Sequence, residues 1–321
     1  MSFTKMCRLP FESLFSYLLR LANKNYISIL EILGPCNIAK SHLTMKSIYF
    51  INHCPMGTIN IQTLSELIGL PCDKILDMSF YNLLMKFEYN NRISTSMILV
   101  RLLHREYHYC PQCLAEGPPH HQLLWSIRII EMCHKHNVRL KKECIHCKQV
   151  IQLKDVEDFL YCPYCGGNLK ITREHLEILN PECVRNQKWL ISNFKFLLTK
   201  SDVQLNRKEF AVRLLYLLNG LRPKFDKNQV KQLINDDINL HMLIEHTHDY
   251  VYKKKHYNLK AAKNILSITN STFEQLFHMQ VPKSFYDSLC GIKLKNMTCY
   301  APWCNYRGEL KMSSDSFQAH I

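Results

Sequence analysis

The stretch that decides the fold contains four short ligand pairs: Cys110-Pro111-Gln112-Cys113, Cys133-His134-Lys135-His136, Cys144-Ile145-His146-Cys147 and Cys162-Pro163-Tyr164-Cys165. Two residues separate the ligands of each pair, which lets a tight turn present both side chains to one zinc ion. Two pairs complete a tetrahedron. In chain order they predict one site of Cys110, Cys113, Cys133 and His136 and a second of Cys144, Cys147, Cys162 and Cys165. Spacing alone also allows an interleaved pairing, the first with the third and the second with the fourth.

These sites are expected to be structural, because four protein ligands leave no position for water or substrate. A zinc deaminase is the enzymatic alternative, since His104-Arg105-Glu106 precedes the first cysteine pair and resembles the deaminase signature. The details favour the structural site. The two segments are only a few residues apart, and Pro111 follows Cys110, whereas the deaminase motif has proline before its cysteine.

Free buried thiols are the other alternative for the cysteines, but four consecutive pairs with the same spacing argue against it. Fifteen of the 321 residues are cysteine, which is below the density of a disulfide scaffold. His134 could replace His136 as a ligand, although its position next to Cys133 would strain the turn. We expect surface or capping roles for His120, His121 and His146.

The composition predicts a folded, basic protein of about two or three domains. Apolar residues make up 47% of the chain, and 41 Lys and Arg against 27 acids give a net charge of +14. That excess indicates a polyanionic partner, first of all nucleic acid. The sequence predicts no membrane span, no secretory signal and no Walker ATPase loop, so a cytoplasmic protein without a membrane partner is expected.

Helical periodicity dominates outside the cysteine region. Residues 14–21 form one amphipathic pattern, and residues 61–79 resemble a helix-turn-helix that bends at Gly69. Helices are also expected over 184–198 and 208–218, with joints at Pro181 and at 220–223. We therefore predict a mainly α protein with small zinc-binding elements and short strands. Its expected parts are an N-terminal helix-turn-helix domain (1–108), tandem zinc fingers (109–172), a helical domain (173–250) and a basic helix-turn-helix with a further candidate zinc finger (251–321).

The C-terminal part contains a second helix-turn-helix pattern. One helix is expected over 258–266 and another from Ser271, with Ser271 or Asn270 as its cap and Glu274 completing a capping box. Residues 250–300 hold eight lysines against two acids. If this unit binds DNA, we expect groove contacts from Thr272, Gln275 and His278 and phosphate contacts from Lys253, Lys254, Lys255, Lys260 and Lys263. A packing module with solvated lysines is the equal alternative, and it is the favoured one for residues 61–79, which carry one lysine and no arginine.

A fifth pair suggests a third zinc site. Cys299 and Cys304 are separated by four residues, and His320 follows after 15 more. Three ligands are visible, so the fourth would be His256, Cys290 or a residue beyond Ile321.

Several of these motifs together resemble the TniQ/TnsD family. They are the opening Glu12-Ser13-Leu14-Phe15-Ser16-Tyr17-Leu18-Leu19-Arg20-Leu21-Ala22-Asn23-Lys24-Asn25, the segment Tyr109-Cys110-Pro111-Gln112-Cys113-Leu114, Trp125, the segment Cys133 to Leu140 and the two later cysteine pairs. The resemblance covers residues 9–170 with specific motifs and 180–290 more loosely. It implies a non-enzymatic adaptor that recruits a AAA+ transposition ATPase to target DNA, which is recognised directly or through a CRISPR effector complex.

We therefore predict a target-site selector for DNA transposition that reads DNA directly. The same adaptor recruited through a CRISPR effector complex, and a plain sequence-specific transcription factor, are the alternatives. The implied partners are the AAA+ ATPase and target DNA. The sequence leaves open whether the chain forms a homodimer.

Overall fold

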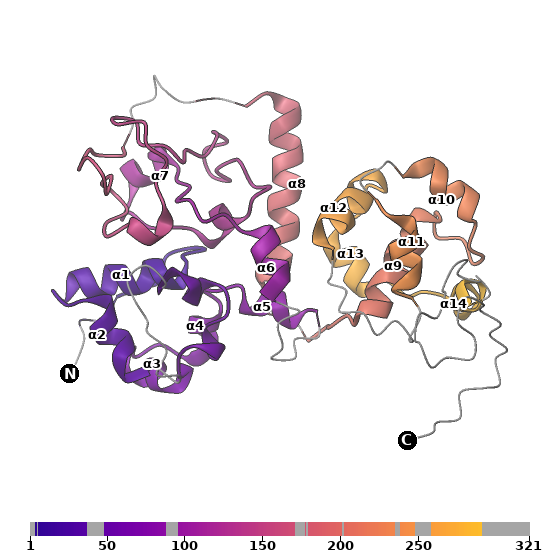
Figure 1. Cartoon of the computed structure of the whole chain (residues 1–321), viewed down its shortest axis with the longest axis horizontal. Coiled ribbons are helices and arrows are strands. Elements are labelled where there is room, and N and C mark those ends of the chain that lie inside the picture. Colours follow the sequence, from indigo (N-terminus) through magenta and orange to yellow (C-terminus); the bar gives the residue numbers. More distant parts are fainter. Residues whose placement is uncertain are drawn as a thin grey trace, which may run out of the picture.

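The computed structural model is mainly helical (Figure 1). It describes residue 4 and residues 6–36, 48–87, 96–170, 177, 179–200, 202–234, 238–247 and 258–290. Within these ranges no β-strand forms, and the only β structure consists of isolated antiparallel bridges. The mainly α fold class with zinc-binding elements is thus confirmed. The prediction of short strands in the cysteine region is wrong, because three of the four knuckles are closed by a single bridge rather than a ladder, and the first pair lies at the start of a helix.

The N-terminal body consists of short helices. They are α1 (Leu14–Lys24), α2 (Ile29–Leu33), α3 (Ile61–Ile68) and α4 (Cys72–Leu76), with 3-10 turns at Gly34–Cys36, Ile48–Asn52 and Pro55–Gly57. The predicted helix-turn-helix is α3 and α4. Gly69 joins them in the left-handed conformation at φ 70°, which glycine adopts at little cost. The Ser65 hydroxyl donates to the Leu70 carbonyl at 2.6 Å, so this small side chain ties the first helix to the turn.

The C-terminal body packs around α8 (Pro181–Leu198), the long helix in the centre of Figure 1. The other helices here are α9 (Arg207–Leu218), α10 (Lys227–Leu233), α11 (Leu240–Glu245), α12 (Leu259–Ile268), α13 (Phe273–His278) and α14 (Lys283–Cys290). The joint expected at Pro181 stays a prediction, and the structure places this residue at the start of a helix. It is the first residue of α8, capped by Asn180, because a proline at this position loses no helical hydrogen bond.

The C-terminal helix-turn-helix forms from α12 and α13, but its cap differs from the prediction. Asn270 takes the left-handed conformation and Ser271 is buried, so the second helix starts later than expected. Thr272 is the cap, and Gln275, not Glu274, completes the capping box. The expected caps at Ser271 and Asn270 are therefore wrong by one or two residues.

Two hydrophobic cores share the cysteine region. One contains the N-terminal helices and much of the knuckle region, including Tyr107 and Trp125. The other contains α5 (Tyr81–Met85) and α6 (Ser96–Leu102) together with the helices from α8 onward. The 3-10 turn Leu123–Ser126 contributes to both, because Leu123 and Leu124 belong to one core and Trp125 to the other. The domain boundaries proposed from sequence stay a prediction.

A buried polar network fixes α1 against the turn Leu123–Ser126. The Glu12 carboxylate is fully buried, accepts from Arg20 at 2.6 Å and accepts from the Ser16 hydroxyl at 3.1 Å. The His121 imidazole lies between the hydroxyls of Ser13, at 3.0 Å, and Ser126, at 3.3 Å. The side chains of Glu12, Ser13, Ser16, Ser126 and His121 all have hydrogen-bond partners, which is the condition under which burying a polar network stabilises a fold. The adjacent Trp125 Nε1 and Gln122 Oε1 have none within the described residues.

None of the helices in the described ranges is long and apolar enough to cross a lipid bilayer.

His121 makes the fold sensitive to acid. Burial lowers the pKa of His121 from 6.5 to about 3, so the folded protein keeps it neutral while the unfolded chain takes up a proton below pH 6.5. The stabilisation by neutral His121 is complete above pH 6.5. Below that pH the free energy of unfolding falls, with a slope that approaches about 1.4 kcal/mol per pH unit. In His121→Gln we expect a lower free energy of unfolding at pH 7.5 than in the wild type. The difference in free energy of unfolding between the two proteins, measured by denaturant titration, should become smaller as the pH is lowered. A difference that stays constant down to pH 5 would contradict this.

Candidate metal centres

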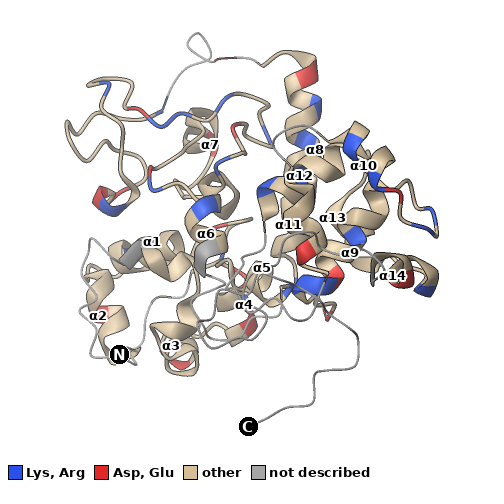
Figure 2. Cartoon of the chain, turned by 45° about the vertical axis from the view of Figure 1, so that its right-hand side comes forward, with Lys and Arg blue, Asp and Glu red and all other residues tan. Residues whose placement is uncertain are grey.

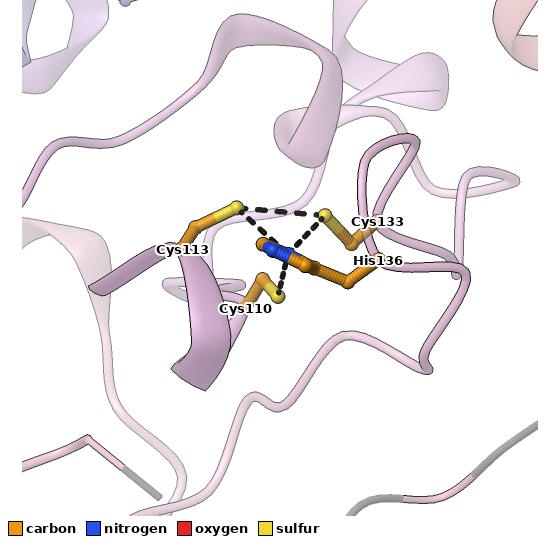
Figure 3. A group of neighbouring side chains, drawn as sticks. All are labelled: Cys110, Cys113, Cys133 and His136. Atoms are coloured by element: carbon orange, nitrogen blue, oxygen red, sulfur yellow. Dashed lines mark hydrogen bonds between the residues drawn. The ribbon is translucent and has the colours of Figure 1, made fainter. Parts of the chain in front are cut away.

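The first cluster brings Cys110, Cys113, Cys133 and His136 together (Figure 3). The Nδ1 atom of His136 lies 3.4 Å, 3.3 Å and 3.6 Å from the sulfurs of Cys110, Cys113 and Cys133, and the sulfurs of Cys113 and Cys133 are 3.6 Å apart. A tetrahedral zinc ion with bonds of about 2.3 Å to sulfur and about 2.0 Å to nitrogen requires ligand separations of about 3.5 to 3.8 Å. The cluster therefore has the size and donor set of a zinc site.

The second cluster contains Cys144, Cys147, Cys162 and Cys165. Its sulfurs lie 3.7 Å apart between Cys144 and Cys165 and 3.8 Å apart between Cys147 and Cys162. These separations fit an all-cysteine zinc tetrahedron. Both groups follow chain order, so the structure does not contain the interleaved pairing that spacing left open.

Three of the four knuckles share one backbone geometry. In each, the residue after the second ligand is left-handed: Asn137 at φ 56°, Lys148 at φ 62° and Gly166 at φ 68°. Its amide donates to the carbonyl of the first ligand, at 2.9 Å, 3.0 Å and 2.9 Å respectively. An antiparallel bridge closes each knuckle from outside: Met132 with Arg139, Glu143 with Val150 and Tyr161 with Asn168. The backbone alone thus turns each ligand pair toward a common point.

The first pair is built differently. Cys110 is the N-cap and Pro111 the first residue of α7 (Pro111–Glu116), and Cys113 lies in its first turn. A helical turn presents Cys113 beside the Cys110 thiol, and the Leu114 amide donates to the Cys110 carbonyl at 3.1 Å. Proline suits this position because the first helical amide has no partner within the helix.

Glu116 orients the histidine of the first cluster. The Nε2 atom of His136 donates to a Glu116 oxygen at 2.9 Å, and the Lys135 ammonium donates to the other oxygen at 2.6 Å. Hydrogen bonds from Lys135 and His136 hold the pKa of Glu116 below its usual value, so the carboxylate stays ionised. A carboxylate on the distal nitrogen leaves Nδ1 as the ligand atom. Sequence reasoning missed Glu116, because nothing in the spacing relates it to His136.

The structure separates the other histidines from the clusters. His134 does not lie among the sulfurs; its ring meets Phe11 edge-on with centroids 5.5 Å apart. His146 bonds the Asn168 carbonyl at 2.8 Å. His104 stacks on His108 with centroids 3.9 Å apart and belongs to neither cluster. The deaminase alternative needs His104 as a ligand, and this geometry does not supply it.

The DNA-contact residues predicted from sequence remain predictions. Thr272 and Gln275 form the capping box of α13, so the Thr272 hydroxyl and the Gln275 side-chain oxygen already accept backbone hydrogen bonds. His278 ends that helix with its ring 6.3 Å from Phe196. Lys260 and Lys263 lie on α12. Lys253, Lys254 and Lys255 lie outside the described residues, as do His256 and the third-site candidates Cys299, Cys304 and His320.

Fold and clusters together define a helical protein with two helix-turn-helix units and a central region cross-linked by metal ligands. Residues 7–140, which contain the first cluster, match the family model TniQ. Residues 7–140 are therefore similar to the TniQ family, and this match supports a role in DNA transposition. No curated protein matches the chain.

Removing one ligand of the first cluster should release one zinc. In Cys113→Ser we expect one zinc fewer per chain and a lower melting temperature, because the metal contributes its binding free energy to folding. Cys183→Ser is the matched control, since Cys183 is exposed and belongs to neither cluster. Elemental analysis with thermal melting measures both. An unchanged zinc content in Cys113→Ser would contradict the site, and two zinc ions per wild-type chain would remove the third site.

Gly166→Ala tests the knuckle geometry. A Cβ at Gly166 meets no atom within 4 Å, but its φ of 68° is strained for any L residue. We expect a loss of about 1 kcal/mol in the free energy of unfolding and easier removal of zinc from the second cluster by chelator. Gly117→Ala is the control, because its φ is −157° and its Cβ also meets open space. Equal stability of the two variants would show that the left-handed turn is not required.

Proposed function

We propose that this protein selects target sites in DNA transposition, bridging target DNA and a AAA+ transposition ATPase without catalysing a reaction. The observation that carries the proposal is the TniQ match over residues 7–140. The matched region runs from the buried network of α1 to the first four-ligand cluster, so it includes the structural parts that define the N-terminal body.

The geometry of the clusters supports a scaffold role. Each cluster has four protein ligand atoms within 4.8 Å of one another, and a filled tetrahedron has no position at which a substrate or an activated water could bind. We propose two structural zinc ions, held by Cys110, Cys113, Cys133 and His136 and by Cys144, Cys147, Cys162 and Cys165. A third ion would use Cys299, Cys304 and His320.

Direct reading of DNA is the preferred mode, because the net charge of +14 favours a polyanionic partner. In this mode Lys253, Lys254, Lys255, Lys260 and Lys263 contact phosphates beside α12 and α13. One observation argues against groove contacts from α13: its exposed residues are Glu274, Gln275 and His278, so this face carries an acid and no Lys or Arg. Recruitment through a CRISPR effector complex is the alternative that does not require α13 to read DNA. A transcription factor that uses α12 and α13 alone would need no ATPase.

One binding experiment separates these possibilities. The zinc-loaded full chain is immobilised and mixed with the transposon's AAA+ ATPase and ATP, with target DNA present or absent. We expect the ATPase to be retained in a DNA-dependent amount. Failure to retain it under every condition would refute the adaptor role, and DNA binding without the ATPase would indicate a transcription factor. DNA binding that appears only when a guide complex is added would identify RNA-guided recruitment.

A further inference from the structure

A basic cleft is lined by residues on both sides of the Cys133 knuckle in the sequence, and its lining contains none of the metal ligands and no residue of either helix-turn-helix unit. It has a volume of about 240 Å³ and is lined by His104, His108, Arg128, Ile130, Glu131, Arg139, Leu140 and Lys142. Its three cations come from two separate segments, one leading into the Cys133 knuckle and one leading from it to the Cys144 knuckle. We call this site the interknuckle cleft.

The cleft is preformed, because backbone hydrogen bonds join the segments that line it. The His104 amide donates to the Ser126 carbonyl at 2.7 Å, and the Arg128 amide donates to the Leu102 carbonyl at 2.9 Å. On the other side, the Leu140 amide donates to Glu131 at 2.8 Å, and the Lys142 carbonyl accepts from Ile151 at 2.9 Å. A ligand would therefore bind without ordering these loops, which lowers the free energy that binding must supply.

Two of the cations are available to a ligand. Arg128 is anchored through Nε, which donates to the Leu103 carbonyl at 2.8 Å, and its remaining guanidinium nitrogens form no ion pair within the described residues. Lys142 is exposed and likewise has no ion pair there. Arg139, by contrast, is paired with Glu131 at 3.6 Å and Glu177 at 2.8 Å. A fixed guanidinium beside an ammonium is a typical arrangement for binding phosphate oxygens.

The stacked imidazoles form a flat wall beside these cations. His104 and His108 lie with ring centroids 3.9 Å apart and an interplanar angle of 24°. The Glu106 carboxylate lies 3.5 Å from His104 Nδ1, and the Glu106 carbonyl lies 3.3 Å from His108 Nδ1, so both rings are held in place. Figure 2 shows Lys or Arg positions on α6 and on loops near it. Arg101 lies in the last turn of α6, and Arg105 follows in the next segment.

We propose that the interknuckle cleft binds a backbone phosphodiester of nucleic acid, with Arg128 and Lys142 as the contact residues. The inference rests on the proposed function, since it locates the nucleic-acid contact of the adaptor. It differs from the sequence-based prediction, which placed all phosphate contacts in the C-terminal module. Phosphate binding by the cleft requires zinc only indirectly, because the segments that carry Lys142 and Arg139 are held by the two clusters.

Charge reversal tests the cleft in the full-length, zinc-loaded chain. Arg128→Glu/Lys142→Glu is compared with Lys260→Glu/Lys263→Glu on α12 and with a control, Lys227→Glu/Lys231→Glu, on exposed positions of α10. All three variants change the net charge by the same amount. Fluorescence anisotropy is measured over a salt series with a short labelled DNA duplex and with a single-stranded RNA of matching sequence. Zinc content and melting temperature show that each variant is folded.

The cleft variant should bind on the order of tenfold more weakly than the control at moderate salt, with a salt dependence reduced by about two counterions. Loss for DNA alone or for RNA alone identifies which nucleic acid supplies the phosphate. Wild-type affinity in a folded cleft variant overturns the inference and leaves the adaptor proposal intact. Failure of the wild-type chain to bind either probe overturns both the cleft and direct reading of DNA.

Discussion

The closure of two four-ligand tetrahedra is the constraint on which the centre of the molecule depends. Between Tyr109 and Lys170 the chain forms only one short α-helix, α7, two 3-10 turns and isolated bridges. Single bridges cannot hold such a segment in one conformation, because a lone pair of strands is at best marginally stable in water. The ligand pairs replace the missing ladder. Each ion would join two knuckles distant in sequence, and this cross-linking would make the region a rigid layer.

The rigid layer matters because both hydrophobic cores use it. Trp125 packs into the core of the N-terminal helices, and its neighbours Leu123 and Leu124 pack into the core that surrounds α8. The same turn is tied to α1 through His121 and its two serine partners. The orientation of the N-terminal body relative to α8 is therefore set through a short segment that the first cluster flanks on both sides.

The sequence predicted the parts of this structure that depend on local chemistry. Ligand spacing predicted both clusters, and the glycine at position 69 predicted the turn of the first helix-turn-helix. The cap of α13 could not be located as well, because Ser271, Thr272 and Asn270 are all good cap residues and the choice depends on the left-handed turn at Asn270. Glu116 and the interknuckle cleft were not predicted, since both arise from residues that only the folded chain brings together.

Contacts with α8 also include two features that are unfavourable in isolation. Phe11 has a positive φ of 55°, which is strained for a bulky residue, and its ring lies 4.7 Å from the Lys195 ammonium of α8. Lys86 is buried with its ammonium 4.7 Å from the Phe196 ring and without a hydrogen-bond partner in the described residues. Burial lowers the pKa of Lys86 to about 8. Strain and desolvation of this kind persist only where the surrounding packing fixes the conformation. The Phe11–Lys195 contact therefore argues that the segment before α1 is held against α8, whereas the Lys86 contact lies within the core that α5 shares with α8.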